Sequence, residues 1–218
     1  MPPQPLVRTG ILHVPRVDGA AGEAVAQLLI GTLRRVVIQQ ESYAASDRRW
    51  LEETLGKWCD EDELDLLVTI GGTLPASGPS GVEVVPEATA AVVERLVPGL
   101  AEAMRAEVGA DFVGASLHRG VAGIRGRTLI VNLPAGRRAA PRFLEAIVEE
   151  LPYILAHLQG EGATMTLEDI LGGEEAGAGA AQMPEPRPAT PISPKPSAKG
   201  LNAEDFAAFL RRGKAGEV

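Results

Sequence analysis

Short apolar runs alternate with amphipathic segments over the first 160 residues of the chain. Four runs rich in aliphatic and β-branched residues predict buried strands. They are residues 8–15, 35–40, 64–70 and 128–134. Between them, apolar side chains recur every three or four residues, which predicts helices. These are residues 22–35, a helix capped by Ser46 or Asp47 that runs to Trp58, and residues 88–96, 98–108 and 141–158. The alternation predicts an α/β fold.

The order of these elements predicts the architecture more closely. Two further short strands are expected around residues 112–117 and 120–124, where glycines suit a hairpin or a bulge. Strands that alternate with helices favour a three-layer α/β/α domain with a mostly parallel central sheet. We place this domain at residues 1–160. Ligands of such sheets bind at the carboxyl ends of the strands, so the turns after residues 70 and 134 are expected at one edge.

The composition changes after residue 160. Residues 172–200 contain six prolines and almost no large apolar residue, so they cannot bury enough surface to offset the entropy of ordering. We predict a flexible linker over residues 161–200 and a short amphipathic helix within the tail at 201–218. Residues 201–212 carry apolar side chains on one side, which favours docking on this subunit, a neighbour or a protein partner; a frayed tail is the alternative.

Charge and cysteine content narrow the class of protein. The formal net charge of −8 argues against a nucleic-acid partner, since phosphate backbones are bound by clustered Lys and Arg. No apolar run approaches the ~20 residues of a membrane span. The N-terminus lacks the pattern of a signal peptide, and the single Cys59 cannot form an internal disulfide. These features predict a soluble, cytoplasmic protein that contacts no membrane.

A glycine-rich turn follows the most apolar strand. Gly71 and Gly72 let the backbone turn with positive φ and approach a ligand closely, and Thr73 adds a hydroxyl group. Such a turn suits phosphate binding. The alternative is a tight connection between a strand and a helix with no ligand. By contrast, His13 in the first predicted strand has no His or Cys at metal-binding spacing, so it is interpreted as a core histidine.

Four segments in order resemble the molybdopterin-binding MoaB/Mog family, over roughly residues 6–160. The family signature runs approximately TTGGTG, RDVTPEAT, PGFGEAMR and LSRAVAGIRGxTLIVNLPGSPKA. Here the corresponding segments are VTIGGT (68–73), PEAT (86–89), VPGLAEAMR (97–105) and HRGVAGIRGRTLIVNLP (118–134). The joint occurrence of four segments is far more specific than one glycine motif.

The resemblance implies a function and a set of site residues. It implies a molybdenum-cofactor biosynthesis protein that binds molybdopterin and, if active, adenylylates it with Mg-ATP. Gly71, Gly72 and Thr73 would hold phosphate, and Glu83 would take the position of the family's catalytic, metal-binding aspartate. Asp47 is a second candidate acid, with helix capping as the alternative. In the turn after the last strand, Gly136 and Arg137 would contact the pterin side of the ligand. The family also implies a homotrimer.

Departures from the signature keep alternatives open. Ile70 replaces Thr, Leu74 replaces Gly, Glu83 replaces Asp, and the family's Gly-Ser-Pro turn is Ala135-Gly136-Arg137 here. These changes favour a second hypothesis, in which a degenerate homologue keeps the fold and acts as a binding or interaction module. A third hypothesis is a nucleotide-dependent α/β enzyme of another family, although no GxxxxGK[ST] motif is present.

Overall fold

A computed structural model describes residues 6–33, 35–76 and 82–160, all within the first of the chain's two units, Met1–Gly173. The predicted linker at 161–200 and the helix at 201–212 lie outside the described residues. The strands are β1 (Val7–His13), β2 (Val36–Tyr43), β3 (Leu66–Ile70), β4 (Arg95–Leu96), β5 (Ala122–Arg125) and β6 (Thr128–Leu133). The helices are α1 (Gly19–Thr32), α2 (Arg48–Asp60), α3 (Val85–Val92), α4 (Pro98–Gly109), the 3₁₀ helix η1 (Val113–Leu117), α5 (Ala139–Glu145) and α6 (Leu151–Leu158).

The six strands form one mixed sheet in the order β2-β1-β3-β6-β5-β4. The first four of these are mutually parallel, whereas β5 runs antiparallel to β6, and β4 antiparallel to β5. Buried side chains fill every position of β3 and β6, as expected for central strands covered on both faces. The prediction of a mostly parallel central sheet is confirmed.

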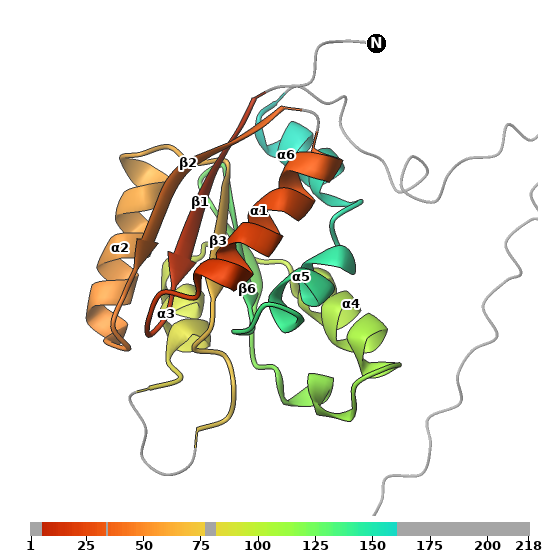
Figure 1. Cartoon of the computed structure of the whole chain (residues 1–218). Coiled ribbons are helices and arrows are strands. Elements are labelled where there is room, and N and C mark those ends of the chain that lie inside the picture. The colour runs from red at the N-terminus through yellow and green to blue at the C-terminus, as the bar shows by residue number, and fades with distance from the viewer. Residues whose placement is uncertain (1–5, 34, 77–81, 161–218) are drawn as a thin grey trace, which may run out of the picture. The chain divides into compact units, whose positions relative to one another are not determined.

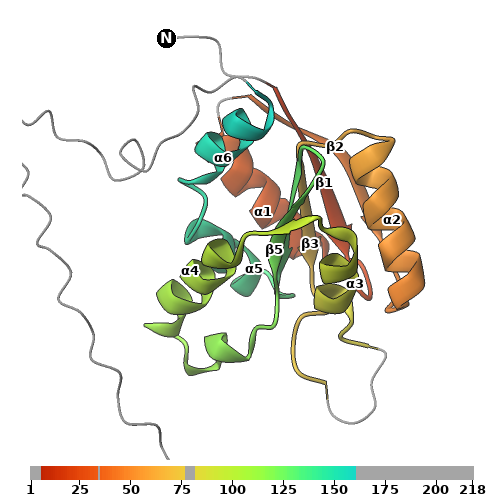
Figure 2. The ribbon, with the colours of Figure 1, turned by 180° about the vertical axis from the view of Figure 1, so that it is seen from behind.

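Each face of the sheet has its own core. One core joins the sheet to α1, α4, α5 and α6, and includes Leu29, Met104 and Leu144. The other joins it to α2 and α3, and includes Leu55 and Val85. Figure 1 shows α2 and α3 on one side of the strands and the remaining helices on the other, and Figure 2 shows the same layers from behind. The predicted three-layer α/β/α architecture is therefore confirmed.

The strand expected at 112–117 is instead the 3₁₀ helix η1. The amide of Ala115 donates to the carbonyl of Phe112 at 3.0 Å, and Val113 is 98% exposed. Of the apolar residues in η1, Ala115 packs into the α1-side core, whereas Val113 and Leu117 are exposed. The edge position of the sheet is taken by β4, which the sequence had assigned to the end of the 88–96 helix.

Two predicted helices differ from their expected bounds. The helix expected at 88–96 is α3, Val85–Val92, and residues 95–96 form β4, which pairs with β5 instead of continuing the helix. The segment 141–158 is two helices, α5 and α6, rather than one. Pro152 lies in the first turn of α6, where its missing N–H costs nothing, whereas inside a continuous helix it would break the bond to residue 148.

One buried hydroxyl in the sheet has no hydrogen-bond partner. Thr9 in β1 is fully buried and alternates with Val7 and Ile11 of the α1-side core, and its Oγ1 has no partner among the described residues. Replacing it with the isosteric valine removes an unsatisfied polar group. We expect Thr9→Val to raise the free energy of unfolding by about 1–2 kcal/mol, measured by urea denaturation. An unchanged or lower midpoint would mean that the hydroxyl has a partner in solution.

Candidate functional site

Three turns meet at the carboxyl ends of β1, β3 and β6. The Gly71 amide after β3 donates to the carbonyl of Leu133 at 2.9 Å. A Cβ on Gly71 would overlap the Val14 carbonyl oxygen and lie 3.5 Å from the Cβ of Ala135. Gly71 therefore lies between the turn after β1 and the turn after β6, with a φ of 97°. The expectation that the 71–73 and 134–138 turns share one edge is confirmed, and only glycine fits between them.

The turn continues through Gly72 into a buried threonine. Gly72 also has positive φ, 66°, and a Cβ there would lie 2.5 Å from Cγ2 of Val85 at the start of α3. Thr73 is 1% exposed, and its Oγ1 has no partner among the described residues. A buried hydroxyl without a partner is rare in native proteins and marks unmet hydrogen-bonding capacity. The turn thus offers both the close backbone approach and a free polar atom to an anionic ligand.

The structure brings Glu83 to this turn. Its Oε2 accepts the Leu74 amide at 2.9 Å, across nine positions of sequence. The preceding residue, Val82, is held by Ser46, which lies just before α2. Ser46 Oγ donates to the Val82 carbonyl at 2.7 Å. Glu83 therefore lies beside the glycine turn, and its carboxylate already occupies one of the turn's N–H donors.

Arg119 connects both arms of this loop, and the sequence reasoning assigned it no role. Its amide donates to the Thr73 carbonyl at 2.9 Å, and its Nη1 donates to the Glu83 carbonyl at 3.2 Å. Its Nη2 pairs with Oε1 of Glu87 in the first turn of α3. Arg119 lies in the segment HRGVAGIRG (118–126), which matches the family signature, and this match could have marked it as a candidate site residue. Arg119 thus contacts the glycine turn through its backbone amide, and its guanidinium joins Glu83 to α3.

The turn after β6 is tied to the turn after β1 by Asp18. Asp18 Oδ2 accepts the Gly136 amide at 2.9 Å, while Oδ1 accepts the amide of Ala21 and caps α1. Gly136 has a φ of 109°. Arg137 is exposed, and within the described residues its guanidinium makes no hydrogen bond or ion pair. Arg137 is therefore available at this edge, and Asp18 is a second residue that the sequence reasoning missed.

Asp47 lies at the start of α2, next to the residue that binds the Glu83 segment. Its Oδ1 accepts the Trp50 amide at 2.9 Å, which is the geometry of an N-cap. The capping interpretation of Asp47 thus has direct structural support, and Ser46 places this end of α2 against the loop that carries Glu83. A catalytic role for Asp47 stays a prediction.

Comparisons with known proteins show the family of this chain. No family model matches the chain. A molybdopterin adenylyltransferase of Helicobacter pylori (strain J99) is 35% identical over 143 residues, which cover 66% of this chain and 79% of that protein. The chain belongs to the MoaB/Mog family. Its fold is similar to the MoaB structure of Thermus thermophilus, with a TM-score of 0.63, 35% identity, and coverage of 71% of this chain and 98% of that one.

A second solved structure agrees with this assignment. A molybdopterin biosynthesis protein from Mycobacterium abscessus has a TM-score of 0.62 and 28% identity, and the match covers 72% of this chain and 98% of that one. Among the helices that the structure describes, none combines the length and the apolar character needed to cross a bilayer.

The described residues form no metal-binding cluster of their own. Within ranges 6–33, 35–76 and 82–160, no group of three or more His, Cys, Asp or Glu side chains is placed to hold a metal ion. Mg²⁺ is commonly held by only one or two carboxylates together with substrate phosphates and water. A carboxylate of this kind, that of Glu83, lies at the glycine turn.

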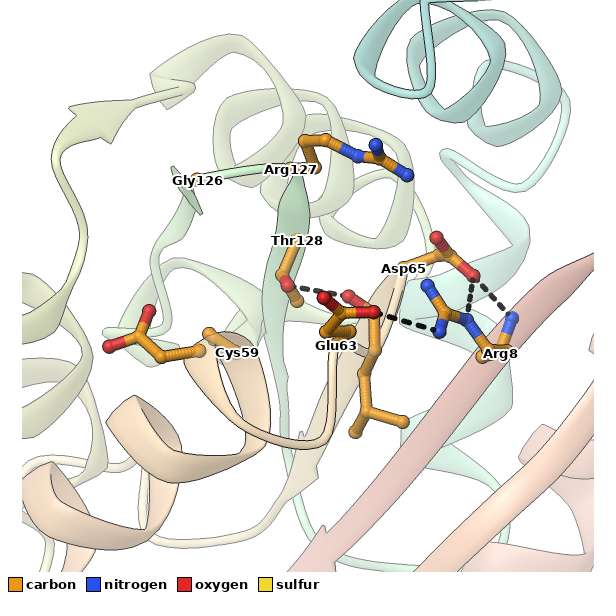
Figure 3. A pocket seen from close by; sticks show the side chains of 9 residues that line it. Arg8, Cys59, Glu63, Asp65, Gly126, Arg127 and Thr128 are labelled. Atoms are coloured by element: carbon orange, nitrogen blue, oxygen red, sulfur yellow. Dashed lines mark hydrogen bonds and ion pairs between the residues drawn. The ribbon is translucent and has the colours of Figure 1, made fainter.

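A pocket of about 250 Å³ lies at the opposite edge, where the strands begin (Figure 3). Two of its acids pair with Arg8: Arg8 Nε donates to Asp65 at 3.1 Å, and Nη1 lies 3.6 Å from Glu63. Burial alone would raise the pKa of Asp65, but the hydrogen bonds from Arg8 outweigh it and hold that pKa below its ordinary value. Burial raises the pKa of the Cys59 thiol to about 11, so no thiolate nucleophile is present at neutral pH. These satisfied pairs indicate a structural role.

Proposed function

We propose that this protein binds molybdopterin and transfers AMP from Mg-ATP to its terminal phosphate, with release of pyrophosphate, as part of molybdenum-cofactor biosynthesis. The observation that carries the proposal is the bond between Glu83 Oε2 and the Leu74 amide, because it places the candidate acid directly on the glycine turn. The name of the H. pylori relative, which covers most of this domain, supports the same reaction. Phosphoryl-type transfer depends mainly on positioning and on neutralising charge, which loop donors and an acid beside them can provide.

Each residue of the site has a distinct role in this proposal. The backbone of Gly71 and Gly72 and the hydroxyl of Thr73 hold phosphate at the end of β3. A phosphate that takes the Leu74 amide displaces the Glu83 carboxylate, which then faces the reacting phosphates as a charge-positioning group. Glu83 would hold Mg²⁺ together with the substrate phosphates, and the ion would neutralise their negative charge. Gly136 and Arg137 contact the pterin side of the ligand from the turn after β6.

Bound pterin is the direct test of this function. The protein would be purified from a host that makes molybdopterin, and the released ligand oxidised and measured by its fluorescence. Conversion of Mg-ATP with added molybdopterin would then be followed by the appearance of adenylylated product. An empty site would contradict the proposed ligand, and it would favour a nucleotide-dependent enzyme of another class.

Binding without turnover is the second candidate function. Two observations favour it: Asp47 is engaged as a helix cap, and Glu83 is one methylene longer than the aspartate of the family signature. A longer side chain moves its carboxylate by roughly 1.5 Å, which can cost on the order of 10²-fold in rate. A protein that carries pterin but produces no adenylylated product would be such a binding module.

A homotrimer is part of the proposal, since family resemblance implies it. Three large apolar side chains in and beside η1 are strongly exposed: Phe112 by 68%, Val113 by 98% and Leu117 by 56%. Exposed apolar clusters on a folded domain favour protein contacts. We expect sedimentation to give about three times the 22.8 kDa of one chain. A monomer at micromolar concentration would contradict this, and Val113→Asp is the matched variant that should dissociate the assembly.

Two further expectations stay predictions. The segment 201–212 is proposed as the docking site for a protein partner or a neighbouring subunit, on its sequence pattern alone. A cytoplasmic location is proposed because this is where the substrate of such a reaction and ATP would both be available.

A further inference from the structure

A continuous chain of hydrogen bonds runs from β2 to the turn after β6. Glu41 Oε1 in β2 lies 2.9 Å from Nε2 of His13, at the end of β1. The Asp18 amide donates to Nδ1 of the same ring at 3.3 Å. The carboxylate of Asp18 then accepts the Gly136 amide at 2.9 Å. Four residues, separated by as many as 118 positions in sequence, are thereby linked.

The contacts assign the donor and acceptor nitrogens of the imidazole ring. An N–H group points at Nδ1, so Nδ1 must be the acceptor, and the ring proton lies on Nε2 and is donated to Glu41. The ring is 1% exposed. A Cβ on Gly22 of α1 would lie 2.7 Å from Glu41 Oε1 and 2.8 Å from Cε1 of His13, so α1 packs closely over the pair. The ring therefore has little room to turn.

Asp18 is what joins the two loops. Strands β1 and β6 are not neighbours, because β3 lies between them in the sheet. Among the described residues, the Asp18–Gly136 bond is the hydrogen bond that connects residues 14–18 with residues 134–138. Gly136 has positive φ and, as a glycine, has no Cβ to restrict its backbone. The Asp18 carboxylate therefore fixes the direction of this peptide through its hydrogen bond with the Gly136 amide.

We propose that His13 and Asp18 are positioning residues for the turn at 134–138. His13 holds the Asp18 backbone, Asp18 holds the Gly136 amide, and the fixed turn presents Arg137 to the ligand. The inference rests on the proposed function, since the turn's role in ligand binding is part of that proposal. In this proposal His13 and Asp18 act through the turn, so losing either should weaken binding through a displaced turn.

Two replacements of His13 separate this role from simple packing. In His13→Asn, the side-chain oxygen occupies the place of Nδ1 and can accept the Asp18 amide, although the contact with Glu41 is lost. In His13→Gln, the longer amide reaches Glu41 but leaves no acceptor at the Nδ1 position. Asp18→Ser is a third variant, because serine still caps α1 but has no second oxygen for Gly136. Melting temperatures would establish that each variant is folded.

Two readouts test the proposal on the full chain. Hydrogen–deuterium exchange of the Gly136 amide should accelerate on the order of tenfold in His13→Gln and Asp18→Ser, and stay near the wild-type rate in His13→Asn. The pterin that copurifies per chain should fall by a similar factor in the first two variants and recover in His13→Asn.

The outcomes distinguish the inference from the proposed function. Unchanged Gly136 exchange in His13→Gln and Asp18→Ser would overturn the hydrogen-bonded chain. Faster exchange with full pterin content would overturn its positioning role. A wild-type protein that carries no pterin would refute the proposed ligand and with it any positioning for pterin, while the exchange rates would still decide whether the hydrogen-bonded chain exists.

Discussion

Glu83→Gln is expected to reduce adenylyl transfer by at least about 10²-fold while sparing pterin binding. The substitution removes the negative charge but keeps the volume and an acceptor oxygen, so the contact with the Leu74 amide can persist. Adenylyl transfer between two phosphate-bearing substrates needs the negative charge of Glu83 beside the reacting phosphates. Retention of pterin depends instead on the turns after β3 and β6. The loss should therefore appear in kcat rather than in the amount of bound pterin.

Two variants complete this experiment. Asp47→Asn keeps an oxygen that can cap α2, and it should leave turnover near that of the wild type if Glu83 is the functional acid. Glu83→Asp restores the residue of the family signature and tests whether the extra methylene limits the rate. Unchanged turnover in Glu83→Gln would show that the assigned role is wrong, and Asp47 would become the better candidate.

Acid is expected to destabilise this protein through His118. The side chain is 2% exposed, its ring packs against Phe143 with centroids 4.6 Å apart, and neither ring nitrogen has a partner among the described residues. Burial, together with the positive charge of Arg105, lowers the pKa of His118 to about 4. The imidazole is therefore neutral in the folded protein across the whole neutral range.

The sign of the effect follows from this depressed pKa. In the unfolded chain the histidine titrates near 6.5. Between pH 6.5 and pH 4 the unfolded state takes up a proton that the folded state does not, so the free energy of unfolding falls as the pH falls. The shift corresponds to a loss of about 3 kcal/mol by pH 4, with little further change below that pH from this group.

His118→Leu is the matched variant for this prediction. Leucine fills the apolar space beside Phe143 and cannot titrate, and it also removes the unpartnered N–H group. Urea denaturation at several pH values should give wild-type and variant curves that diverge by about 3 kcal/mol between pH 6.5 and pH 4. Protonation of carboxylates such as Asp65 also lowers the free energy of unfolding in acid, but this contribution is the same in both proteins. Parallel curves would mean that His118 gains a partner in solution.

Local sequence determined most of the sheet and the place of the site. The apolar runs at 64–70 and 128–134 correspond closely to β3 and β6, because strands buried on both faces need an almost unbroken apolar run. Gly71 and Gly72 identified the turn because glycine, which has no Cβ, readily adopts the positive φ that the turn requires. The four matching segments led to the family, which the relatives confirm.

The tertiary structure decided which side chains meet. The contacts of Asp18 with Gly136 and of Arg119 with Thr73 join turns from different strands, and they depend on how those strands are ordered in the sheet. The tertiary structure also determined that residues 112–117 do not form a strand. An apolar run becomes a strand only where a neighbouring strand can pair with it, and β4 occupies the edge beside β5. Periodicity reports each residue's local environment, but a hydrogen bond across 118 positions exists only once separate elements have packed together.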